Sequence, residues 1–91
     1  MEFEWDPIKA VQNLAKHGIT FEYATGVFFD PHRRDQEDRR RDYAEERRVS
    51  LGRAGGRVLS VAYTPRGDIL RLISARKANP REQRKYNDEA L

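Results

Sequence analysis

The hydrophobic and polar positions at the start of the chain predict a strand followed by a helix. Residues 1–5 alternate apolar and acidic side chains, MEFEW, which is typical of a short strand with one apolar side. Asp6 and Pro7 are typical of a helix N-terminus, and Gly18 after His17 is typical of a helix end. Apolar residues recur on one face of this helix: Ile8, Val11 and Ala15, flanked by Leu14.

A second helix and a highly charged segment follow. Thr20 is a typical N-cap, and apolar residues then recur at helical spacing, at Phe21, Ala24 and Phe28. Asp30 should end this helix, because the residue before a proline avoids helical geometry. Residues 32–48 are almost wholly charged, with both signs alternating. We interpret them as a loop that leads into a strand at about Glu46.

Three apolar runs and a final helix complete the pattern. The runs cover residues 47–52, 57–64 and 68–76. Short segments with hairpin-turn residues separate them, which predicts an antiparallel meander with the middle run at its centre. A last helix begins at typical capping residues, Asn79, Pro80 and Glu82. We therefore predict one α+β domain over residues 1–91, a small antiparallel sheet packed by helices in the order β-α-α-β-β-β-α.

The composition indicates a thin core under a charged shell. The 91 residues are 37% hydrophobic and 36% charged, and none is cysteine, which excludes a disulfide framework and thiolate chemistry. The apolar runs are too short to span a membrane, and the acidic start is unlike a signal peptide. We therefore expect a cytoplasmic protein with no membrane partner.

The charge is unevenly distributed along the chain. Residues 1–46 carry 7 basic and 11 acidic side chains, a net charge of −4, whereas residues 47–91 carry 11 basic and 4 acidic side chains, a net charge of +7. Fourteen of the 18 basic residues are arginine, whose planar group binds phosphate through two hydrogen bonds. This pattern favours a polyanionic partner, with a solvated surface as the alternative.

The sequence shows neither a metal site nor a phosphate-binding glycine loop. The two histidines, His17 and His32, lie in different segments without ligand spacing, so we expect no metal and no cofactor. Cleavage of RNA needs neither, because RNA carries its own nucleophile, the 2′-hydroxyl. An enzyme need only remove the proton of that hydroxyl, bind the charge that develops on the phosphate and protonate the leaving oxygen.

Several residues are candidates for that chemistry, and each has a structural alternative. Lys16 and His17 end the first helix, where the helix dipole favours a protonated imidazole, although the pair could simply complement that dipole. Glu46 could act as a base or could pair with a neighbouring arginine. Arg71 interrupts an apolar strand, and a buried cation needs a partner or a functional reason. Trp5 fits either the core or a stacked base.

The approach to the last helix, residues 75–86, is strongly basic. Five of its twelve residues are Arg or Lys and only one is acidic. Arg76 and Lys77 precede the helix N-terminus at Asn79, where free backbone N–H groups favour a phosphate. The segment is therefore either an RNA-binding surface or a solvated face. Its Tyr86 fits a helix anchor better than a proton donor.

These residues together resemble BrnT-type toxins of bacterial type II toxin–antitoxin pairs. The N-terminal features are W-D-x-x-K and N-x-x-K-H-G, at Trp5, Asp6, Lys9, Asn13, Lys16, His17 and Gly18. Residues 61–86 are similar to the closing strands of the family and its R-x-I-S-A-R-x-A signature, with a conservative change at Leu72. The resemblance covers nearly the whole chain except residues 32–44.

The resemblance implies a compact fold like that of RelE-type ribonucleases and cleavage of RNA that inhibits translation and growth. A cognate BrnA-like antitoxin would neutralise the toxin, and the complex would bind its operator DNA through the antitoxin. Whether the complex contains a homodimer is left undecided by the resemblance. The catalytic residues that we predict are Lys16, His17, Glu46, Arg71 and Arg76. The predicted RNA-binding residues are Trp5, Lys9, Arg66, Lys77, Arg81, Arg84 and Tyr86.

Two other functions fit the same sequence. A non-catalytic nucleic-acid-binding module would use the basic helix alone, and an interaction scaffold would bind no nucleic acid. Lys16, His17 and Arg71 favour the ribonuclease, since simple binding of phosphate needs no histidine. A strong salt dependence of binding would argue against the scaffold.

Overall fold

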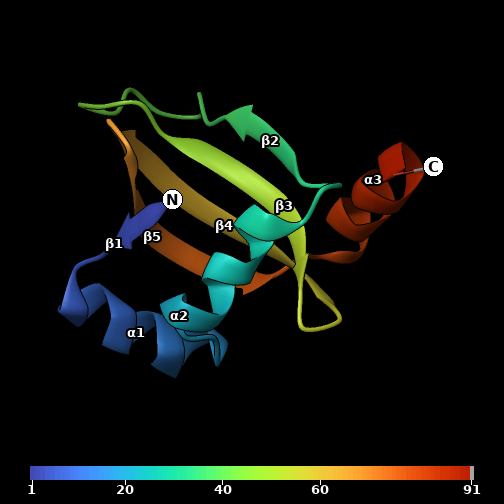
Figure 1. The fold of residues 1–91 in the computed structure, drawn as a ribbon, viewed down its shortest axis with the longest axis horizontal. Coiled ribbons are helices and arrows are strands. Elements are labelled where there is room, and N and C mark those ends of the chain that lie inside the picture. The colour runs from blue at the N-terminus through green and yellow to red at the C-terminus, as the bar shows by residue number, and fades with distance from the viewer. Residues whose placement is uncertain (91) are drawn as a thin grey trace.

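The computed structural model describes residues 1–90, with the side chains of residues 1–88, and shows a five-stranded sheet with three α-helices (Figure 1). The strands are β1 (Glu2–Glu4), β2 (Arg34–Glu37), β3 (Arg48–Ala54), β4 (Arg57–Arg66) and β5 (Ile69–Lys77). The helices are α1 (Pro7–His17), α2 (Phe21–Ala24), the 3₁₀ helix η1 (Thr25–Phe29) and α3 (Pro80–Ala90). Across the part of the chain described, no helix is both long and apolar enough to cross a membrane.

The sheet has the strand order β1-β5-β4-β3-β2. The predicted meander of β3, β4 and β5 is confirmed, with β4 at the centre. Two predictions were wrong. The charged segment contains a strand, β2, which pairs with β3, and β1 pairs with β5 in parallel, so the sheet is mixed and the order is β-α-α-β-β-β-β-α.

A polar network explains why the charged strand β2 joins the sheet. The Asp35 carboxylate accepts hydrogen bonds from the Ser50 hydroxyl, the Tyr63 hydroxyl and the Arg48 guanidinium. Burial alone would raise the pKa of Asp35, but these hydrogen bonds lower it. The strand is therefore attached to β3 and β4 through side chains that lie far away in the sequence.

The helix boundaries follow the predicted capping residues. Asp6 accepts a hydrogen bond from the Ile8 N–H, and Gly18 ends α1 with a positive φ of 70°. Thr20 caps α2 through the Tyr23 N–H, after which the chain tightens into η1.

The main core lies between one face of the sheet and the α1–α2–η1 layer. Its buried side chains include Ile19, Phe21, Val27, Phe28, Leu59, Val61, Tyr63 and Leu72. Gly52 allows η1 to approach β3, because a Cβ atom there would lie 2.6 Å from Val27 Cγ1. The predicted apolar face of α1 does not join this core, since Ile8 and Val11 are exposed.

Candidate active site

The second face of the sheet is covered by α3 at one end only. There Tyr86 packs with three apolar side chains, Leu51, Val58 and Ala78. Figure 1 shows α3 beside the sheet at the end away from α1. Beyond this cluster the face carries small or polar side chains that line a hollow of about 270 Å³: Gln36, Val49, Ser60, Ala62 and Ser74. We call this space the sheet-face hollow.

Arginines from two parts of the chain border the sheet-face hollow. Arg76 comes from β5, where it lies opposite Ser60 of β4, and Arg40 and Arg47 come from the segment between β2 and β3. Arg39, from the same segment, also lines the hollow, so four guanidinium groups there provide donors for a phosphate or another oxyanion. The acidic side chains at the same hollow are Glu37, Asp38 and Glu82.

Arg76 is held in place by Glu82 from the first turn of α3. The two guanidinium nitrogens donate to the two carboxylate oxygens at 2.8 and 3.0 Å. These hydrogen bonds raise the pKa of Arg76 and lower that of Glu82, and the nearby charge of Arg40 acts against the first shift. Arg76 therefore stays charged at the edge of the hollow.

Arg40 is fixed by a carboxylate beneath it. The Asp38 side chain is only 2% exposed and accepts hydrogen bonds from the backbone, Nε and Nη2 of Arg40. The hydrogen bonds from Arg40 hold the pKa of Asp38 well below its usual value, against the opposing effect of burial. Asp38 is consequently an anionic support for the loop rather than a proton donor.

Arg47 has hydrogen-bonding capacity left over. Its guanidinium stacks over the Tyr43 ring at 4.6 Å, and its Nε lies 3.9 Å from Asp38 Oδ2. Within residues 1–88, Arg47 Nε is the one buried side-chain nitrogen or oxygen without a hydrogen-bond partner. A buried donor without a partner is costly, and because protein atoms cover this nitrogen, a ligand in the hollow could reach it only after the side chain moves.

A shallower groove lies across the edge of β5 from the sheet-face hollow. It has a volume of about 240 Å³ and is lined by Lys9, Gln12, Asn13, Lys16, His17, Ile73 and Ser74. We call it the α1 groove. Ser74 lines both spaces, so the groove and the hollow meet at this residue of β5.

Asn13 fixes α1 against β5 beside this groove. Its side-chain amide donates to the Ala75 carbonyl and accepts from the Ala75 N–H, at 2.9 and 3.0 Å, and also donates to the Ile19 carbonyl. At this position the Asn13 amide makes the backbone hydrogen bonds that a further strand beside β5 would make. The position of Lys16 and His17 relative to Ser74 depends on this contact.

The described side chains offer no obvious metal site. Within residues 1–88, no three carboxylate or imidazole side chains lie close enough together to hold a metal ion.

Comparison with known proteins identifies the family. A family model for the BrnT ribonuclease toxin of type II toxin–antitoxin systems matches residues 5–82. The chain belongs to this family. A comparison with curated proteins finds no match. The matched range covers α1, the strands β2 to β5 and the first turn of α3, so it includes both the hollow and the groove. As a BrnT family member, the chain has an antitoxin partner and an RNA target.

The sheet-face hollow and the α1 groove together include four of the BrnT residues predicted from the sequence. Arg76 borders the hollow, and Lys9, Lys16 and His17 line the groove. The structure brings these residues to the two sides of Ser74. Their chemical roles stay predictions.

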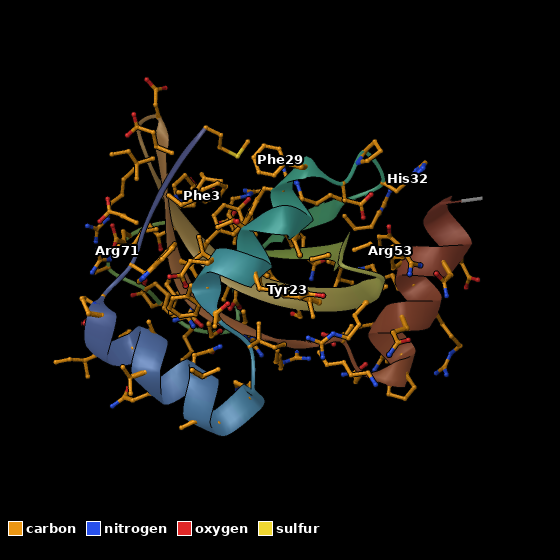
Figure 2. All side chains as sticks on the ribbon, turned by 60° about the horizontal axis from the view of Figure 1, so that its bottom comes forward. Phe3, Tyr23, Phe29, His32, Arg53 and Arg71 are labelled. Carbon is orange, nitrogen blue, oxygen red and sulfur yellow. The ribbon has the colours of Figure 1, made fainter. Side chains whose placement is uncertain are left out.

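Three predicted residues lie elsewhere, in ion pairs. Arg71 binds Glu4 of β1 at the far end of β5, as Figure 2 shows beside β1. Arg66 binds Glu45 through two hydrogen bonds. Glu46 accepts from Arg48 Nη1 at 2.9 Å. None of the three lines the sheet-face hollow or the α1 groove, so the catalytic roles of Arg71 and Glu46 and the RNA contact of Arg66 stay predictions without support from this geometry.

The remaining predicted RNA-binding residues divide into buried and exposed side chains. The Trp5 ring packs against Phe21 at the edge of the core, and the Tyr86 side chain is buried, with its hydroxyl donating to Asp30. Exposed basic side chains follow the end of β5 and α3: Lys77, Arg81 and Arg84. Stacking of a base on Trp5 or Tyr86 has no support in this placement.

Arg40, Arg47, Ser60 and Ser74 were missed from the sequence. Arg40 and Arg47 lie in the segment interpreted as a loop, where nothing in the alternating charges distinguishes the residues that line the hollow. A signal did exist for Ser60: within β4, Ser60 and Ala62 alternate with Leu59 and Val61. That alternation is typical of a strand with one open, polar face.

Proposed function

We propose that the chain is a metal-independent endoribonuclease that cleaves RNA by attack of the RNA 2′-hydroxyl and thereby inhibits translation and growth. The observation that carries this proposal is that four arginines line one hollow in the open face of the sheet: Arg39, Arg40, Arg47 and Arg76. The four cations outnumber the three carboxylates at the hollow, and the net positive charge suits the phosphate of a scissile bond and the extra negative charge of its transition state. Arginine thus supplies the charge that a metal ion supplies in other nucleases.

Proton transfer is assigned to the α1 groove. RNA that crosses the edge of β5 at Ser74 would meet the arginines on one side and His17 and Lys16 on the other. As the 2′-oxygen forms its bond to phosphorus, its proton passes to water and the bond to the 5′-oxygen breaks. His17 is then the general acid that protonates the 5′-oxygen, and Lys16 stabilises charge beside it. Replacing His17 by Ala should lower the rate of cleavage about 10²–10⁴-fold.

The cellular setting follows from this activity. An RNA substrate implies an enzyme of the cytoplasm, and the open sheet face with its basic border suits a RelE-like ribonuclease. A BrnA-like antitoxin neutralises it, and operator DNA binds only through the antitoxin in the complex. A homodimer in that complex is compatible with the proposal.

The activity can be tested directly on purified protein. Wild type should cut single-stranded RNA in EDTA and leave a 2′,3′-cyclic phosphate or a 3′-phosphate, whereas His17→Ala should bind the RNA and cut it slowly. Loss of cleavage in EDTA with rescue by magnesium or zinc would overturn the metal-independent mechanism. Binding without cleavage would instead favour a non-catalytic nucleic-acid-binding module.

A further inference from the structure

Helix α1 turns its apolar side chains away from the core. Ile8 and Val11 are 68% and 70% exposed, and Leu14 is 48% exposed. The side of the helix that faces the sheet carries the half-buried Ala10 and the buried amide of Asn13. A surface helix normally buries its apolar stripe, so this one is reversed.

The exposed residues form a stripe of the kind that binds a partner helix. Ile8, Val11 and Leu14 are spaced by three residues, which places them on adjacent turns of one face. We call them the α1 stripe. Contiguous exposed apolar surface on a small protein marks a site of interaction. Anchors at this spacing are typical of helix-in-groove and helix-to-helix docking.

The α1 stripe has a basic margin. At about 100° per residue, Lys9, Gln12 and Lys16 follow one another along the same side of the stripe. All three also line the α1 groove. Lys9 and Lys16 lie between the stripe and the groove, so an occupant that covers the stripe and extends toward the groove meets two lysines, and acidic side chains would complement them.

We infer that the α1 stripe is the docking surface of the antitoxin, which presents an amphipathic helix with an acidic border along its apolar face. The inference rests on the proposed function in one respect: it treats the groove beside the stripe as part of the RNA path. A second copy of this chain fits less well. Antiparallel two-fold pairing of α1 with itself would bring the lysine margins of both copies together, and like charges at an interface are unfavourable.

Docking at the stripe explains how an antitoxin could silence the enzyme. Acidic side chains that bind Lys9 and Lys16 occupy the same margin that would otherwise face RNA. The occupant would also approach His17 and Ser74, where the groove joins the sheet-face hollow. Binding and inhibition would then use one surface, without any change in the shape of the hollow.

The test is a titration of toxin variants with the protein encoded by the reading frame next to the toxin gene. Val11→Glu should raise the Kd about 10- to 100-fold, the loss expected for one aliphatic anchor, and Val11→Lys should raise it less, because lysine attracts the acidic border. Phe29→Glu is the matched control. Phe29 is another exposed apolar residue, 67% exposed, and lies beside Phe3 away from α1 (Figure 2).

RNA cleavage by each variant is measured separately, so the two proposals can fail independently. Val11→Glu should still cleave RNA and should arrest growth even when the antitoxin is co-expressed. Unchanged Kd values for both Val11 variants, or a larger effect of Val11→Lys than of Val11→Glu, would overturn the docking inference. A dimer that Val11→Glu dissociates without changing the antitoxin Kd would assign the stripe to a second copy. Ile8→Glu repeats the test if Val11→Glu does not fold. If Val11→Glu weakens binding of the antitoxin but the wild type does not cleave RNA, only the ribonuclease proposal is rejected.

Discussion

Arg76 of β5 and Glu82 of α3 form an ion pair with two hydrogen bonds, of 2.8 and 3.0 Å, at the border of the sheet-face hollow. The same carboxylate accepts the backbone N–H of Asn79, whose side chain in turn accepts the N–H of Glu82. This capping box therefore places the first turn of α3 and the guanidinium of Arg76 together. Glu82, which takes part in the cap of α3, therefore also orients Arg76, the cation proposed to bind phosphate.

Replacing Asn79 by Ala should destabilise the protein by about 1 kcal/mol, because the Glu82 N–H would no longer have its capping acceptor. Urea unfolding followed by circular dichroism measures the change. Asn87→Ala, an exposed position of the same helix, serves as the control and should change stability by less than about 0.5 kcal/mol. Equal effects of the two substitutions would show that the cap contributes nothing specific.

Stability should decrease in acid partly because of Asp38. The pKa of this carboxyl is lowered in the folded protein, so the unfolded chain binds more protons once the pH nears the usual value of 3.8. The contribution is therefore present above that value and is lost as the pH falls through the lower folded pKa. Unfolding free energies measured from about pH 7 to about pH 3 should fall less steeply for Asp38→Asn than for wild type. The exposed Asp68→Asn is the control and should follow wild type.

The Asn13 amide should matter for both stability and cleavage. Asn13→Ala removes three hydrogen bonds and leaves the Ala75 N–H and carbonyl without that partner, so we expect a loss of about 1–3 kcal/mol. Cleavage measured below the unfolding transition should also slow, because α1 carries Lys16 and His17. Gln12→Ala changes an exposed neighbour on the same helix. If Gln12→Ala destabilises as much as Asn13→Ala, the edge contact is not what fixes α1.

The exposed arginines of α3 should contribute to affinity for RNA but not to the choice of bond. In Arg81→Gln with Arg84→Gln, the slope of log K against log salt should fall by roughly 0.7 for each phosphate of a single strand that the variant no longer binds. The cleavage pattern should stay the same. Titrations with a short single-stranded RNA at several salt concentrations measure the slope. An unchanged slope would mean that this charge serves solubility or the antitoxin.

Local sequence patterns were enough to predict most of the elements. The caps at Asp6, Thr20 and Asn79 are set by side chains within three residues of the N–H groups that they bind. Strand β2 could not be predicted in this way, because Asp35 is held by Ser50 and Tyr63, which lie 15 and 28 residues further on. Charge alternation there indicated a loop, and long-range pairing decided otherwise.

The candidate site was predictable only in part, for the same reason. Arg76 and His17 stand out in the sequence, but nothing local shows that Arg47 points into the same hollow as Arg76. The spacing of the apolar residues in α1 predicted a helix, but it did not predict which side of the helix faces the sheet. That orientation depends on Asn13, which binds a backbone 62 residues away.

The most direct test of the central claim, that the sheet-face hollow is where RNA is cut, is the single-turnover rate of cleavage by Arg76→Ala. Arg57→Ala removes an arginine that stacks on Tyr23 outside the hollow and is the matched control. With both variants shown to be folded, Arg76→Ala should cleave about 10²–10³-fold more slowly than wild type, and Arg57→Ala should cleave at the wild-type rate. Cleavage by Arg76→Ala at the wild-type rate would contradict the account and place the reaction elsewhere on the protein.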